Sequence, residues 1–136
     1  MPLINKISIV TTTAVTGATP AALYAHSSHR DWQCDTAMKN ETNEDIALCK
    51  DIAVQLIEDD TGKNINVILG GGRNPLGANL IGDEKDACVR NDGRNLAYEW
   101  LKQKKLANKT ATYVTNSKQL DDFDPKSVDY LLEIII

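Results

Sequence analysis

Four short apolar segments, separated by stretches with helical patterns, constrain the fold of this chain more than any other feature. They cover residues 7–13, 66–69, 110–114 and 128–136, and the first is rich in β-branched residues. Continuous apolar runs are typical of strands buried on both faces, and the helices between them can serve as crossover connections. The pattern therefore predicts an α/β fold, with a doubly wound, mostly parallel sheet flanked by helices.

The segments between the predicted strands contain three helical patterns and one helical turn, over residues 117–120. Thr19 and Pro20 are expected to begin the first helix, because threonine can cap free amides and proline suits the first helical position. Apolar residues at spacings of three and four predict a second helix over residues 44–59. Asp92 is expected to cap a third helix, and the basic run 102–105 is expected to be its solvated end.

Two further segments are expected to lack regular structure. Residues 31–43 are polar and show no apolar periodicity. The run Gly70-Gly71-Gly72 is best explained as a tight exit from a strand. It resembles a phosphate-binding loop only superficially, because Ala78 and Asn79 stand where such a loop needs Lys and Ser or Thr.

Composition and charge exclude several classes of protein. The chain has 136 residues, which is enough for about one domain. Its 15 Lys and Arg residues against 19 Asp and Glu residues give a net charge of −4. That balance argues against a nucleic-acid partner, since phosphate contacts usually need a basic excess. No apolar stretch approaches the roughly 18 residues of a membrane-spanning helix.

The cysteines, histidines and asparagines leave several possibilities open. Cys34, Cys49 and Cys88 show no CxxC spacing, which argues against a zinc ribbon or a thioredoxin-like motif. His26 and His29 lie three apart, but no third ligand motif accompanies them, so surface or packing roles are favoured. Two sequons make Asn40 and Asn108 candidate glycosylation sites, although sequons arise often by chance.

Several segments together resemble the alkaline phosphatase family, in its animal, membrane-anchored and insect-like branch. The resemblance includes Thr19-Pro20-Ala21-Ala22, the tetrapeptide His29-Arg30-Asp31-Trp32 and the run Gly70-Gly71-Gly72-Arg73. It covers, in order, residues 10–26, 29–32, 49–57, 66–73, 90–96, 99–101 and 124–132. The resemblance implies an alkaline-phosphatase-like α/β/α fold and the hydrolysis of phosphate monoesters. In the intact family, a serine nucleophile acts with two Zn²⁺ ions and one Mg²⁺ ion.

Two residues of this chain match functional positions of the family. Thr19 matches the hydroxyl ligand of the magnesium ion, in keeping with the preference of Mg²⁺ for oxygen ligands. Arg30 matches the arginine that holds the phosphate oxygens, which a guanidinium can bind through two parallel hydrogen bonds. Gly17 departs from the family pattern, which often has histidine or aspartate there, so the surroundings of the magnesium ion are expected to differ.

Most of the family's active site has no counterpart in this sequence. The resemblance implies that the serine nucleophile lies upstream and that the Asp-x-x-x-His and Asp-His signatures of the other metal ligands lie downstream. We therefore expect no catalytic residue in this chain and at most a partial Mg²⁺ site. Residues 1–136 are expected to be part of a single domain truncated at both ends, with the family pattern lost after Leu132. The alternative is a non-catalytic module that binds phosphate or a protein partner.

The resemblance also carries expectations about partners, location and cysteines. Family members are typically homodimeric, lipid-anchored glycoproteins, found at the cell surface through a GPI anchor or secreted. The resemblance at Cys49 implies a disulfide to a cysteine upstream of this segment, which leaves Cys34 and Cys88 able to pair with each other. If Thr19 and Arg30 share a site, the first helix must end early, near residues 27–28, with Arg30 on a loop beside residues 11–13.

Overall fold

The strands form one all-parallel sheet, as the apolar segments predict. The computed structural model describes residues 6–41, 48–80 and 88–135. Within these residues the sheet has the strand order β1-β2-β4-β3, and each neighbouring pair is parallel. The strands are β1 (Ser8–Ala14), β2 (Val67–Gly71), β3 (Ala111–Val114) and β4 (Tyr130–Ile134). The predicted α/β class is therefore confirmed.

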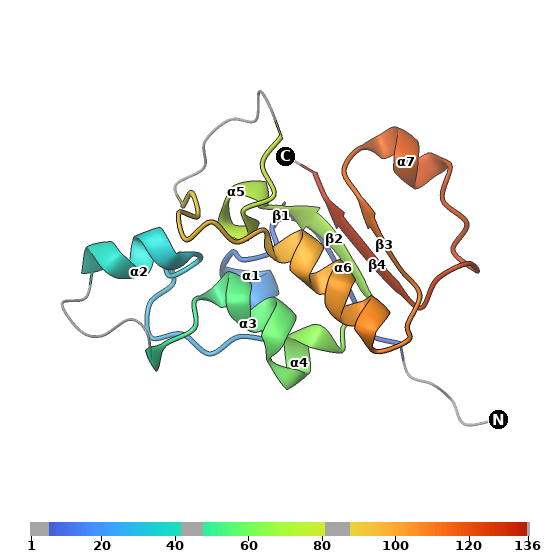
Figure 1. Cartoon of the computed structure of the whole chain (residues 1–136). Coiled ribbons are helices and arrows are strands. Elements are labelled where there is room, and N and C mark those ends of the chain that lie inside the picture. The colour runs from blue at the N-terminus through green and yellow to red at the C-terminus, as the bar shows by residue number, and fades with distance from the viewer. Residues whose placement is uncertain (1–5, 42–47, 81–87, 136) are drawn as a thin grey trace.

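Seven helices of the described residues connect and flank the strands (Figure 1). Both α3 and α6 lie in front of the sheet in Figure 1, whereas α7 follows β3 at the far edge. The helices are α1 (Ala18–Ala21), α2 (Asp35–Glu41), α3 (Ile52–Glu58), α4 (Asp60–Lys63), α5 (Arg73–Leu76), α6 (Leu96–Leu106) and α7 (Ser117–Asp121).

The core lies between the sheet and the helices α3 and α6. Ile9, Ile68 and Leu132 occupy one row across the sheet, because Ile9 pairs with Ile68 and Ile68 with Leu132. Leu56 of α3 and Trp100 of α6 are fully buried in the same cluster. No helix in the described part of the chain is both long and apolar enough to cross a membrane.

The first helix is shorter than expected and begins earlier. α1 starts at Ala18, with Gly17 as its N-terminal cap residue and no capping hydrogen bond from a side chain. Thr19 is therefore inside the helix, and the prediction that it caps the helix is wrong. The helix ends at Ala21, although Ala25 still donates a backbone hydrogen bond to Ala21 across the following turn.

The second and third helices begin later than their sequence patterns suggest. α3 starts at Ile52 because Asp51 caps it: the Val54 amide donates to Asp51 Oδ1 at 2.9 Å. Of the helix expected over 44–59, residues 44–47 lie outside the described residues. α6 is capped by Asn95, not by Asp92, and the Tyr98 amide donates to Asn95 Oδ1 at 3.1 Å.

Two helices lie where no regular structure was expected. α2 occupies part of the segment predicted to be irregular, and α5 directly follows the glycine run. Gly72 and Gly77 enclose α5, and both have positive φ angles, of 100° and 65°. The left-handed conformation of Gly72 allows the sharp exit from β2 that the glycine run predicts, and that of Gly77 ends α5. A Cβ atom on Gly77 would also collide with the Arg94 carbonyl oxygen.

Lys104 is buried, in contrast to the expectation of a solvated end for α6. Only 7% of its surface is exposed. Its Nζ lies 3.8 Å from the centroid of the Tyr130 ring and donates to the Lys63 carbonyl oxygen. Burial, and to a lesser extent the charge of Lys63, lowers the pKa of Lys104 to about 8. Its spacing of four from Trp100 explains the burial, because both side chains share one face of the helix.

The lowered pKa of Lys104 predicts that this residue destabilises the folded chain less at alkaline pH than at neutral pH. Between about pH 8 and pH 10.5, the unfolded chain binds the lysine proton more tightly than the folded chain does. The contribution of Lys104 to the free energy of unfolding should therefore rise with pH in this window, by at most about 3 kcal/mol. Urea denaturation of a Cys49→Ser variant, with and without Lys104→Met, would measure this rise; Cys49→Ser suppresses thiol–disulfide exchange. Parallel pH profiles of the two proteins would contradict the prediction.

Candidate functional site

The candidate site begins in the loop that follows β1, at the carboxyl end of the sheet. Val15 and Thr16 are both completely buried. The Val15 amide donates to the Gly71 carbonyl at 3.0 Å, and the Tyr24 hydroxyl donates to the Val15 carbonyl at 2.9 Å. Burial, together with the negative charge of Asp51, raises the pKa of Tyr24 far above its ordinary value, so the hydroxyl stays protonated as a donor. The loop is thus fixed from both sides.

Thr19 follows this loop and faces a hollow beside the edge strand. Its side chain is exposed, and it lines a hollow of about 470 Å³. Residues of β1, including Thr11 and Thr13, line the same hollow, and so does Leu23. The Thr19 hydroxyl therefore lies at a solvent-accessible place at the carboxyl end of a parallel strand, where α/β proteins usually bind ligands.

Arg30 lies in a turn after α1, with its side chain 79% exposed. The guanidinium pairs with the neighbouring Asp31, with Nε 3.7 Å from Asp31 Oδ1. Arg30 lines a hollow of about 260 Å³, together with residues of α1 and with Ile52. Because an exposed pair of this length contributes little, the guanidinium is available to an anionic ligand.

The structure places Thr19 and Arg30 in neighbouring hollows. Ala18 borders both hollows, but Thr19 borders only the first and Arg30 only the second. The early end of α1 and the position of Arg30 in a turn agree with the expected geometry. However, the threonines of β1 border the hollow of Thr19 and not that of Arg30. The two residues are thus near each other in the fold without sharing one hollow.

Two glutamines that the sequence analysis did not single out hold these segments together. Gln33 Oε1 accepts a hydrogen bond of 2.8 Å from the buried Thr16 hydroxyl, which links the loop after β1 to the segment that follows Arg30. Gln55 Oε1 accepts from the His26 amide at 2.8 Å, and Gln55 Nε2 donates to the His26 carbonyl at 2.9 Å. A polar residue inside the otherwise apolar run of α3 was the signal available in the sequence.

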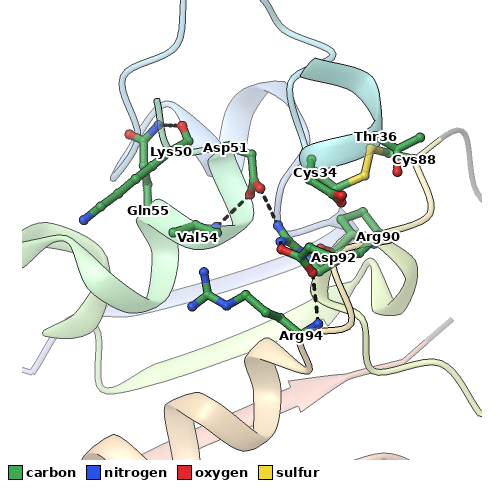
Figure 2. Close-up of polar contacts among 12 residues, drawn as sticks. Cys34, Thr36, Lys50, Asp51, Val54, Gln55, Cys88, Arg90, Asp92 and Arg94 are labelled. Atoms are coloured by element: carbon green, nitrogen blue, oxygen red, sulfur yellow. Dashed lines mark hydrogen bonds and ion pairs between the residues drawn. A yellow bond between two sulfur atoms is a disulfide. The ribbon is translucent and has the colours of Figure 1, made fainter. Parts of the chain in front are cut away.

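A buried ion pair lies below the start of α3 (Figure 2). The Arg90 side chain is completely buried, and its guanidinium donates to Asp51 Oδ2 and to Asp92 Oδ2, both at 2.5 Å. Its Nε also donates to the Pro75 carbonyl at 2.9 Å. Burial raises the pKa of Asp51, and the charge of Arg90 opposes that effect. Because Asp51 also caps α3, this cluster fixes the helix that carries Gln55.

A disulfide joins Cys34 to Cys88, the pairing considered in the sequence analysis. Next to it, the Thr36 hydroxyl donates to the Val89 carbonyl at 2.7 Å, and the Asn91 amide donates to Asp35 Oδ1 at 3.0 Å. The start of α2 is therefore attached to the segment that leads to Arg90. Figure 2 shows the disulfide that makes this attachment. Cys49 is a free, exposed thiol.

The described residues do not form a complete metal site. No group of three or more His, Cys, Asp or Glu side chains among them is arranged to hold a metal ion. Thr19 offers one hydroxyl oxygen, whereas Mg²⁺ binds with near-octahedral oxygen coordination. His29 instead packs its ring at 6.3 Å from that of Trp32. No step of a metal-dependent reaction can therefore be derived from these residues alone.

The two candidate glycosylation sites lie on helices or at their ends. Asn40 belongs to α2, and the threonine of its sequon, Thr42, lies outside the described residues. Asn108 is exposed and follows α6 with a φ angle of 54°, a left-handed conformation that asparagine tolerates. The hydroxyl of Thr110, the threonine of its sequon, donates to Asp129 Oδ2 at 3.0 Å.

The fold and the site define an α/β protein with its candidate ligand-binding residues at the carboxyl end of a parallel sheet. The profile of the family described as alkaline phosphatase matches residues 5–135. The chain therefore belongs to the alkaline phosphatase family.

Curated relatives agree with this assignment. The chain is 45% identical to "Alkaline phosphatase" of Gadus morhua, over 94% of this chain and 27% of that protein. It is 40% identical to "Alkaline phosphatase 4" of Drosophila melanogaster, over 94% of this chain and 22% of that protein. It is 38% identical to "Membrane-bound alkaline phosphatase" of Bombyx mori, over 94% of this chain and 23% of that protein. The chain thus spans about a quarter of the length of these relatives.

Proposed function

We propose that this chain is part of a metal-dependent alkaline phosphatase that hydrolyses phosphate monoesters. Family membership over residues 5–135 supports the reaction class. The observation that carries the role of this chain is the guanidinium of Arg30, which is 79% exposed in a turn after α1 and pairs with Asp31 at 3.7 Å. A guanidinium presents paired donors that match two oxygens of a phosphate group, which the ammonium of lysine cannot reproduce.

In this proposal, Thr19 contributes a hydroxyl oxygen to a magnesium site. Its exposed position after β1, next to the residue that borders both hollows, supports that role. Members of the family generally use Zn²⁺ and Mg²⁺, which can activate a nucleophile and stabilise the charge of a phosphoryl group. The other metal ligands and the serine nucleophile would belong to the remainder of the domain, of which residues 1–136 form one part.

We also propose a cellular location and a state of modification and assembly for the whole protein. A relative named as membrane-bound supports a location at the membrane or cell surface. The disulfide fits an oxidising compartment, where such bonds persist. The proposal also includes glycosylation at Asn40 and Asn108. It further includes dimerisation and lipid anchoring of the whole protein.

A chimeric enzyme tests the role of Arg30. Residues 5–135 would replace the matching segment of the Gadus morhua protein, and hydrolysis of p-nitrophenyl phosphate would be measured. We expect the chimera to be active, and Arg30→Ala to lower kcat/KM by about 10- to 100-fold, the value of a charge-assisted hydrogen bond or two. Arg30→Lys should restore little of the loss. An Arg30→Ala chimera with unchanged kinetics would refute the assignment of Arg30.

The isolated 136-residue chain is expected to show no phosphatase activity. One arginine and one hydroxyl cannot supply the electrostatic stabilisation of a two-metal site that acts with a separate nucleophile. The assay is p-nitrophenyl phosphate hydrolysis by the purified chain with added Zn²⁺ and Mg²⁺. Metal-dependent turnover clearly above the blank would show that the chain contains a catalytic site of its own.

A further inference from the structure

We propose that Gln55 of α3 is a positioning residue for Arg30, acting through the backbone of His26. The proposal rests on the proposed function, since it takes Arg30 to be the residue that binds phosphate. Gln55 does not touch the hollow that Arg30 lines. Its effect would come from fixing the backbone of His26, at the start of the turn that bears Arg30.

The side-chain amide of Gln55 both accepts and donates hydrogen bonds. It is 5% exposed, and its oxygen accepts from the His26 amide at 2.8 Å. Its nitrogen donates to the His26 carbonyl at 2.9 Å and to the Lys50 carbonyl at 3.0 Å. Because the amide both donates to and accepts from one residue, it fixes the orientation of that peptide segment as well as its position.

The other end of the turn is fixed by the same helix. The Ile52 amide donates to the Trp32 carbonyl at 2.9 Å, and the Ala53 amide donates to the Gln33 carbonyl at 3.3 Å. These amides belong to the first turn of α3, where backbone donors lack partners within the helix. Arg30 therefore lies between two attachments to α3, one of which depends on the Gln55 side chain.

Hydrogen bonds within the turn transmit this fixed geometry to Arg30. The Ser27 hydroxyl donates to the His29 carbonyl at 2.7 Å, and the Trp32 amide donates to the same carbonyl at 3.3 Å. The Asp31 amide donates to His29 Nδ1 at 3.3 Å. With both ends held and these bonds between them, the direction in which Arg30 leaves the backbone is set. Loss of the Gln55 amide would free one end.

The chimera described above tests this inference through the inhibition constant of inorganic phosphate. Gln55→Met keeps the length of the side chain and removes its three hydrogen bonds, and we expect it to raise the inhibition constant about 5- to 10-fold. Ile57→Val, on the same helix but outside the hydrogen bonds to the turn, serves as the control. A purely structural effect would lower the amount of active enzyme without changing the inhibition constant. An unchanged inhibition constant in Gln55→Met would overturn the inference.

Two further results separate this inference from the proposed function. If Arg30→Ala does not raise the inhibition constant of phosphate, the assignment of Arg30 fails. If Arg30→Ala raises it and Gln55→Met does not, only the inference about Gln55 fails.

Amide hydrogen exchange in the 136-residue chain tests the same hydrogen bonds without an activity assay. Gln55→Met should speed exchange of the His26 amide at least about 10-fold relative to Ile57→Val, and unchanged exchange would overturn the inference.

Discussion

Replacing Arg90 by methionine should lower the free energy of unfolding by about 3–5 kcal/mol. The guanidinium is completely buried and donates to Asp51, to Asp92 and to the Pro75 carbonyl. Methionine would fill part of the volume but would leave the Asp51 carboxylate buried without its partner. Urea denaturation followed by circular dichroism gives the free energy directly.

Arg94 provides a matched control for this prediction. It pairs with Glu58 at 2.7 Å and with Glu99 at 2.6 Å, but its side chain is 33% exposed. Arg94→Met should cost about 1 kcal/mol or less, because water can solvate the carboxylates that it leaves. Equal losses for Arg90→Met and Arg94→Met would show that burial does not decide the energetics of these pairs.

A second substitution identifies the origin of the loss. Asparagine is an adequate helix cap, so Asp51→Asn removes the charge and keeps an acceptor for the Val54 amide. The double variant Arg90→Met, Asp51→Asn should therefore be less destabilised than the sum of its single changes. Strict additivity would mean that the buried charge of Asp51 is not the cause.

The sheet could be predicted from the sequence because each strand contains a short run of apolar or β-branched residues. Ile9, Ile68 and Leu132 lie in such runs, and burial between the helices and the neighbouring strands requires apolar residues there. The same logic failed for Lys104. Its charge suggested solvent, whereas its spacing from Trp100 placed it on the buried face of α6.

Helix ends could not be predicted in the same way, because they depend on distant partners. Asp51 begins α3, and its carboxylate is held by Arg90, which is 39 residues away in the sequence. Asp92, the expected cap of α6, is instead bound to Arg90, and Asn95 takes its place. Local propensity favoured Asp92 as the cap, and its tertiary hydrogen bond to Arg90 overrode that preference.

The candidate site was predictable only through family resemblance. Thr19 and Arg30 are common surface residues, and no spacing rule distinguishes them from others in this chain. The residues that hold their segments in place could not be predicted in this way. Gln55 binds the backbone of His26, 29 residues away in the sequence, and that contact can be recognised only when the fold is known. The candidate ligand-binding residues are thus suggested by the family resemblance, whereas the hydrogen bonds that hold their segments are seen in the structure.

Removing the disulfide should destabilise the chain by about 4 kcal/mol. Cys34 and Cys88 are 54 residues apart, and closing a loop of that length removes this much conformational entropy from the unfolded chain. The double variant Cys34→Ala, Cys88→Ala, measured by urea denaturation, gives the loss. Cys49→Ala is the control, since its exposed thiol bonds to neither partner and should change stability by no more than about 0.5 kcal/mol.

Mass mapping of the oxidised chain checks the pairing itself. A bridge from Cys49 to either of the other cysteines would contradict the structure.

Loss of the disulfide should also lower the stability of α2 in particular, because the disulfide attaches α2 to the segment that leads to Arg90. In the reduced or substituted chain, amide exchange should therefore accelerate first in α2 and more weakly in α3, whose cap still depends on the Arg90–Asp51 pair. Equal acceleration in both helices would mean that the disulfide stabilises the domain only as a whole.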